Sequence, residues 1–100
     1  MPVYQVQFHP LAIQEFKEAR LWYQRRSART EARFREAVEA GLRSIEKSFD
    51  NLPLLQRGYR FAKVRRFPYV LIATKQSNDT LLIVAVQHGS RKPGYWRRRK

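Results

Sequence analysis

The sequence predicts an α+β domain: a helical hairpin packed on one face of a mostly antiparallel four-stranded sheet, in the order strand, helix, helix, strand, strand, strand. Two long segments repeat their apolar residues with the period of a helix, and four short segments have the patterns of strands. The last three strands are joined by such short turns that they must run antiparallel. One hundred residues suffice for one modest core, so we expect a single domain over residues 1–100.

The first two elements are predicted from the N-terminal quarter of the chain. Residues 3–8 alternate apolar and polar side chains, as a half-buried strand does. Pro10 follows, and proline is favoured in the first turn of a helix. From there to about Arg26 the apolar residues recur at spacings of four, three and four, which is typical of one helical face. These residues are Ala12, Phe16, Ala19 and Tyr23.

A second helix is predicted from about Ala28 to Ser48. Its apolar stripe comprises Phe34, Val38, Leu42, Ile45 and Phe49. Only a short break at Ser27 separates it from the first helix, so the two helices should form an antiparallel hairpin. Pro53 and its neighbours end the second helix and begin a loop.

Three strands are predicted in the remainder, at about 59–64, 68–75 and 80–88. Residues 65–68 form the first connection, and Ser77-Asn78-Asp79 forms a tight turn. With the helices on one face, we expect the other face of the sheet to stay open to solvent or to a partner. Arg60 and Lys63 are expected to point toward that open face.

Positive charge is concentrated in the second half of the chain. Residues 1–58 hold ten Lys and Arg against seven Asp and Glu, whereas residues 59–100 hold eleven against one. The net charge is +13. Such asymmetry produces a focused positive field, which predicts an anionic partner: a nucleic acid or an acidic protein.

The end of the chain has the most unusual composition. After the apolar run 81–86, residues 88–100 contain one His, six Lys and Arg residues, Tyr95 and Trp96. Guanidinium groups attract phosphates and carboxylates, and aromatic rings can stack on bases. We therefore expect these groups to be exposed and to contact an anionic surface.

Several classes of protein are disfavoured by the sequence. It contains no cysteine, and its two histidines are far apart, so neither a disulfide nor a metal site is expected, and no cofactor is predicted. No apolar stretch has the length of a membrane span, and the first residues lack a signal-peptide pattern. We expect a cytoplasmic protein without a membrane partner.

The chain resembles the RelE/ParE superfamily of bacterial type II toxins. The similarity lies in the Trp22-Tyr23 pair, Gly58-Tyr59-Arg60, the segment 64–69 (Val-Arg-Arg-Phe-Pro-Tyr) and the segment 84–96 that ends in Tyr95-Trp96. The resemblance implies the fold predicted above and a cognate acidic antitoxin as partner. It also implies one of two targets: RelE-like members cut messenger RNA on the ribosome without a metal, and ParE-like members bind and poison DNA gyrase.

The ribonuclease alternative assigns roles to specific residues. His88 would act as the acid or base, Lys63 and Arg91 would hold the phosphate, and Tyr95 would contact a base. Arg60, Arg65 and Trp96 would help to bind the substrate. These assignments extend the resemblance to RelE-like nucleases.

Two positions depart from the RelE-like pattern. Phe61 occupies a strand position where such nucleases carry a second Lys, and Val70 occupies one where they carry an Arg. The Phe67-Pro68-Tyr69 connection and the ending 91–96 are more similar to ParE-like members. Both targets therefore stay open at this stage.

Structural alternatives exist for several of these residues. His88 could cap a strand through backbone hydrogen bonds, and Trp96 could fold back on the domain. A basic protein that binds nucleic acid without toxic activity is the alternative to a toxin.

Overall fold

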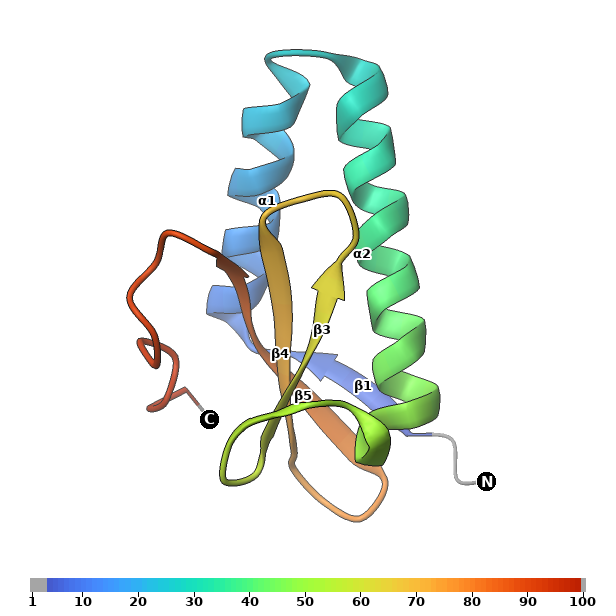
Figure 1. Cartoon of the computed structure of the whole chain (residues 1–100), viewed down its shortest axis with the longest axis vertical. Helices are drawn as coiled ribbons and strands as arrows, with labels where there is room; N and C mark the ends of the chain where they lie inside the picture. The colour runs from blue at the N-terminus through green and yellow to red at the C-terminus, as the bar shows by residue number, and fades with distance from the viewer. Residues whose placement is uncertain (1–3, 100) are drawn as a thin grey trace.

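The computed structural model describes residues 4–99, so the predicted start of the first strand at Val3 and the last residue, Lys100, lie outside the described residues. Two helices pack on a five-stranded mixed sheet (Figure 1). The elements are β1 (Gln5–Phe8), α1 (Pro10–Gln24), α2 (Ala28–Ser48), the 3-10 turn η1 (Phe49–Asn51), β2 (Leu54–Gln56), β3 (Tyr59–Val64), β4 (Tyr69–Lys75) and β5 (Thr80–His88).

The sheet order is β1-β5-β4-β3-β2, with β1 parallel to β5 and every other pair antiparallel. The predicted fold class is confirmed, but the predicted number of four strands is wrong. The additional strand is β2, which pairs with β3 at Leu54 and Gln56 across a register irregularity. Three residues are too few to produce a recognisable alternation, and for that reason the sequence pattern predicted only a loop here.

Each helix begins at a residue whose side chain caps it. The backbone N–H of Leu11 donates to His9 Nδ1 at 3.0 Å, and Pro10 occupies the first helical position of α1. The backbone N–H of Thr30 donates to Ser27 Oγ at 3.2 Å at the start of α2. These caps satisfy N–H groups that have no partner inside the helix, so they fix where each helix begins.

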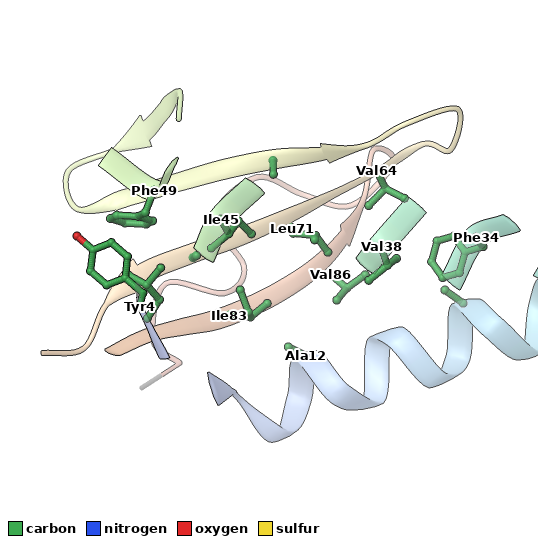
Figure 2. Close-up of a cluster of buried hydrophobic side chains, with 14 of the residues drawn as sticks. Tyr4, Ala12, Phe34, Val38, Ile45, Phe49, Val64, Leu71, Ile83 and Val86 are labelled. Carbon is green, nitrogen blue, oxygen red and sulfur yellow. The ribbon is translucent and has the colours of Figure 1, made fainter. Parts of the chain in front are cut away.

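The main core lies between the helical hairpin and the sheet (Figure 2). Phe34 and Ile45 of α2 are fully buried and face Leu71 of β4 and Ile83 of β5. Gly41 permits close approach of α2 to the sheet, because a Cβ there would lie 2.9 Å from Leu71 Cδ1. The predicted apolar stripes of both helices therefore cover one face of the sheet.

The C-terminal segment covers part of the second face of the sheet, so the prediction of a wholly open face is wrong. Trp96 is only 2% exposed and packs with apolar side chains of β4 and β5: Ile72, Leu82, Val84 and Ala85. Because β5 is apolar on both of its faces, the second face also needs cover from water. Gly94, with φ of +80°, permits the turn that brings Trp96 back.

Candidate functional site

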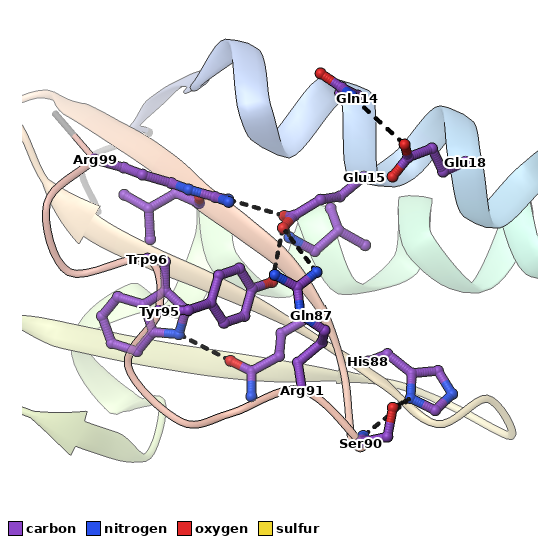
Figure 3. A network of polar contacts seen from close by, with 12 residues as sticks. Gln14, Glu15, Glu18, Gln87, His88, Ser90, Arg91, Tyr95, Trp96 and Arg99 are labelled. Atoms are coloured by element: carbon purple, nitrogen blue, oxygen red, sulfur yellow. Dashed lines mark hydrogen bonds and ion pairs between the residues drawn. The ribbon is translucent and has the colours of Figure 1, made fainter.

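Glu15 of α1 is the centre of a polar network that joins three parts of the chain (Figure 3). Its side chain is 11% exposed. The backbone N–H of Val86 donates to Oε1 at 3.0 Å, and the hydroxyl of Tyr95 donates to Oε2 at 2.8 Å. Arg99 Nη1 donates to Oε1 at 3.0 Å, and Arg91 Nη1 lies 4.0 Å from Oε2. One carboxylate thus holds the C-terminal segment against α1 and β5.

The same network completes the outer edge of β5. The pairing of β1 with β5 ends at Ile83, so the following residues of β5 lack a strand neighbour on that side. There the carboxylate of Glu15 accepts from the N–H of Val86, and Arg99 Nη1 donates to the carbonyl of Val84 at 3.0 Å. Side chains of opposite charge thereby replace the missing strand at these two backbone groups.

Tyr95 is held as a neutral phenol. Burial raises the pKa of its hydroxyl well above the ordinary value, and the hydrogen bond to Glu15 raises it further. The guanidinium carbons of Arg91 and Arg99 lie 4.0 and 4.9 Å from the centre of its ring. The hydroxyl proton and the ring are therefore both engaged in contacts within the protein.

Trp96 lies in the interior, which corrects the expectation of an exposed aromatic ring. Its Nε1–H donates to Gln87 Oε1 at 2.8 Å, and its ring centroid lies 4.7 Å from that of Tyr59. A buried indole with its only donor satisfied is a packing group. The structural alternative, in which Trp96 folds back on the domain, describes this position.

His88 makes the contacts of a strand-end cap. The backbone N–H of Ser90 donates to His88 Nδ1 at 2.9 Å, and Ser90 Oγ lies 2.8 Å from the same nitrogen. The imidazole also meets the ring of Tyr69 at 5.0 Å between centroids. With Arg91 and Trp22, His88 lines an open hollow of about 380 Å³ between α1 and the ends of β4 and β5.

The predicted strand cations lie on opposite faces of the sheet, so the expectation that Arg60 and Lys63 share a face is wrong. Arg60 Nη1 donates to the carbonyl of Leu52 at 2.6 Å, and its guanidinium lies 5.7 Å from the ring centre of Phe49, within the main core. Lys63 is three positions later and is exposed on the other side. Side chains alternate along a strand, so an odd separation places them on opposite faces.

The remaining predicted cations divide between two places. Arg91 and His88 share the hollow beside α1, and Arg91 also contacts Tyr95. Lys63 and Arg65 line a different hollow, at the connection between β3 and β4. The structure therefore brings His88, Arg91 and Tyr95 close to α1, although the ring of Tyr95 packs on the second face of the sheet, and it leaves Lys63 and Arg65 outside that group.

Sequence reasoning missed Glu15, although a signal for it exists. Glu15 lies three residues after Ala12 and four before Ala19, both of which are buried. A carboxylate beside the apolar stripe of a helix needs partners, because burial of an unpaired charge is costly. The excess of arginine in the last ten residues supplies them.

Residues 4–99 contain neither a candidate metal site nor a candidate membrane span. No group of three or more His, Cys, Asp or Glu side chains there is arranged to hold a metal ion. In the same part of the chain, no helix has the length and apolar character needed to cross a membrane.

Comparison with known proteins resolves the family. The profile of the family described as "ParE toxin of type II toxin-antitoxin system, parDE" matches residues 6–93, from β1 to the turn after β5. The chain belongs to the ParE toxin family. This membership confirms the resemblance to the RelE/ParE superfamily noted from the sequence motifs.

A solved structure from a ParDE toxin–antitoxin system has the same fold as this chain. A protein of the "Chromosomal ParDE TA system from P. aeruginosa" aligns with a TM-score of 0.72 over 86% of this chain and 96% of that chain, at 9% sequence identity. At this identity the likeness shows the fold alone. No curated protein sequence matches the chain. The contacts of Tyr95, Trp96 and Arg99 lie after the last residue that the ParE profile matches.

Proposed function

We propose that this ParE-family protein inhibits bacterial growth by binding DNA gyrase in the cytoplasm, and that a cognate acidic antitoxin neutralises it. Within the superfamily, the ParE-like members are the gyrase poisons, and this chain has the two departures from the RelE-like pattern at Phe61 and Val70. Inhibition of gyrase requires a binding surface and no catalytic groups.

The observation that carries the proposal is the bond from the Tyr95 hydroxyl to Glu15, 2.8 Å long. A ribonuclease of the predicted design would need His88, Lys63 and Arg91 around a single phosphate and Tyr95 free to contact a base. The hydroxyl of Tyr95 is hydrogen-bonded to Glu15, and Nδ1 of His88 accepts a hydrogen bond from Ser90. Lys63 lies on the opposite face of the sheet from His88. This arrangement favours binding over RNA cleavage.

The charge of the chain supports an acidic antitoxin as partner. With a net charge of +13, the surface attracts an acidic chain strongly at low ionic strength. Such a partner can be disordered alone and fold on binding. Masking the basic surface would also keep gyrase away.

The decisive experiment measures supercoiling by purified gyrase in the presence of the purified chain. We expect inhibition that rises with the concentration of the chain. Primer extension on translated messages, made in cells that express the chain, should reveal no new cleavage sites. Gyrase that supercoils DNA unhindered at an excess of the chain would refute the proposal, and new cleavage sites would favour the ribonuclease.

The variant His88→Gln separates the two mechanisms. Removal of a general acid or base lowers the rate of a cleavage reaction about 10²- to 10⁴-fold, so a ribonuclease would lose its toxicity. A gyrase inhibitor in which His88 only caps a turn should still arrest growth. The purified variant must first be found folded by its far-UV circular dichroism spectrum.

A further inference from the structure

A second hollow, of about 450 Å³, lies at the turn between β3 and β4, apart from the Glu15 network. Three exposed cations line it: Lys63, Arg65 and Arg66. The rest of its lining is mostly apolar and includes Phe67 and Val70. The turn lies at the end of the sheet opposite the β4–β5 turn (Figure 1). We name this feature the hairpin hollow.

The cations of the hairpin hollow have no acidic partner among residues 4–99. Glu15, Glu31 and Asp50 are the acids that form ion pairs within residues 4–99. None of these pairs includes Lys63, Arg65 or Arg66. Three like charges that lie close together repel one another, and a bound anion would relieve that repulsion. The hollow is therefore a surface on which negative charge is favoured.

The backbone at Arg66 points to a role for its side chain. Its φ of +73° lies in the left-handed region, where it is the one non-glycine among the described residues. Glycine adopts this conformation without the steric cost that a Cβ brings. Strained backbone of this kind is found preferentially at binding and catalytic sites. An arginine here is thus better explained by binding than by folding.

We propose that the hairpin hollow binds an acidic peptide segment of a partner protein, with one aliphatic side chain on the apolar floor and carboxylates on the three cations. The apolar floor favours a peptide over a nucleic acid. The rings of Phe67 and Tyr69 are already packed against Tyr23 and Phe34 of the core, with centroids 5.0 to 6.3 Å apart. They are therefore poor platforms for the stacking of bases.

This inference deepens the proposed function, on which it rests for the acidic partner protein, and it does not depend on gyrase as the target. An aliphatic side chain alone would give the partner little specificity, and carboxylates alone would bind anywhere on so basic a protein. The combination of a floor and a charged rim at one place is what distinguishes this hollow.

The test uses the full chain and a fluorescently labelled synthetic peptide in which one Leu is flanked on both sides by Glu residues. Fluorescence anisotropy gives its Kd. We expect the triple variant Lys63→Gln, Arg65→Gln, Arg66→Gly to bind about tenfold more weakly. The control variant Arg43→Gln, Lys47→Gln, Arg57→Gln removes the same charge from exposed positions elsewhere and should change the Kd less than about twofold.

Two further binding measurements test the apolar floor of the hairpin hollow and the strained backbone of Arg66. Replacement of the peptide's Leu by Asn should weaken binding by the wild-type chain about fivefold. The single variant Arg66→Gly should weaken binding about threefold while the thermal midpoint stays equal or rises, because glycine relieves the strained φ. A structural role for Arg66 would not produce this opposite pair of effects.

The proposal is overturned by any of three results. If the triple variant and its control lose equal affinity for the peptide, the protein attracts the peptide only through its diffuse positive charge. No effect of the Leu-to-Asn change would mean that the floor is unused. A single-stranded oligonucleotide of the same net charge that binds more tightly than the peptide, and loses that affinity in the triple variant, would make the hollow a nucleic-acid site.

Discussion

Glu15 and Val86 are joined by a hydrogen bond across 71 positions of the chain: the backbone N–H of Val86 donates to Oε1 of the carboxylate at 3.0 Å. This bond places a helix side chain where a longer β1 would otherwise continue to pair with β5. The same carboxylate also accepts hydrogen bonds from Tyr95 and Arg99. The C-terminal segment is therefore positioned by an acid near the other end of the chain.

We expect Glu15→Gln to lower the free energy of unfolding by about 2 kcal/mol, because hydrogen bonds to a charged group contribute about 1.5–3 kcal/mol and the amide lacks the charge. The amide hydrogen of Val86 should exchange faster with solvent. Urea denaturation and hydrogen-exchange NMR measure these two effects. The loss of stability and the faster exchange at Val86 should appear together, since the carboxylate of Glu15 is responsible for both.

Glu18→Gln is the matched control for this prediction. Glu18 is one turn later on α1, is exposed, and makes only a 3.5 Å contact with Gln14. Its substitution should change the unfolding free energy by less than about 0.5 kcal/mol. If the two variants were equally stable, the carboxylate of Glu15 would have no special role in holding the C-terminal segment.

The two helices and the β3–β4–β5 meander were predictable because each has a local signal. The apolar stripes of α1 and α2 have the helical period, and Ser27 marks a start that the structure also has. The rule that strand side chains alternate also excludes a shared face for Arg60 and Lys63, which are three positions apart. That prediction failed through neglect of this rule.

The path of the C-terminal segment could not be predicted in the same way. Trp96 packs on a face formed by β4 and β5, and Tyr95 bonds to α1; these contacts join residues with no periodic relation. Their composition, rich in cations and rings, suits an exposed binding tail equally well. Only the apolar character of both faces of β5 indicated that the second face needed cover.

We expect the hydroxyl of Tyr95 to ionise at a higher pH than any free tyrosine, because burial and the bond to Glu15 raise its pKa. The pKa in the folded state exceeds the unfolded value of about 10, so the stabilisation is complete below about pH 10 and is lost as the pH rises through the folded pKa. Spectrophotometric titration should show a late tyrosinate step that is absent from Tyr95→Phe. In urea, both proteins should titrate near the ordinary value; a late step that survives in Tyr95→Phe would assign it to another tyrosine.

Glu31 should produce the opposite dependence at acidic pH. Hydrogen bonds from Arg20, at 2.7 Å, and Arg35, at 2.6 Å, lower the pKa of its carboxyl. Its stabilisation is therefore complete above the unfolded pKa of about 4.3 and is lost as the pH falls through the lower, folded pKa. We expect the urea midpoint to fall between about pH 5 and pH 2, and the fall to be smaller in Glu31→Gln.

The exposed residue Glu36 of α2 supplies the comparison for this acid transition. Glu36→Gln should retain the pH dependence of the wild-type chain. Identical slopes for Glu31→Gln and the wild type would show that other carboxyl groups govern the acid transition, and the bridge between α1 and α2 would then contribute little.

The two tryptophans offer a direct measure of how firmly the C-terminal segment is held. Trp96 is 2% exposed and Trp22 is 47% exposed. Trp96→Ala removes a buried ring and its bond to Gln87, so we expect a loss of about 3 kcal/mol in the free energy of unfolding, measured by urea denaturation. Trp22→Ala should cost less than about 1 kcal/mol, because a surface ring loses little on truncation.

Limited proteolysis distinguishes a global effect of Trp96→Ala from a local one. A segment held by Trp96 should become cleavable after its arginines in the variant while the helices and sheet stay intact, because local opening exposes only those bonds. Cleavage at equal rates in the two tryptophan variants, with equal urea midpoints, would mean that Trp96 packs on the sheet without stabilising it. The second face would then be covered by a segment that opens freely, and the Glu15 network alone would determine its position.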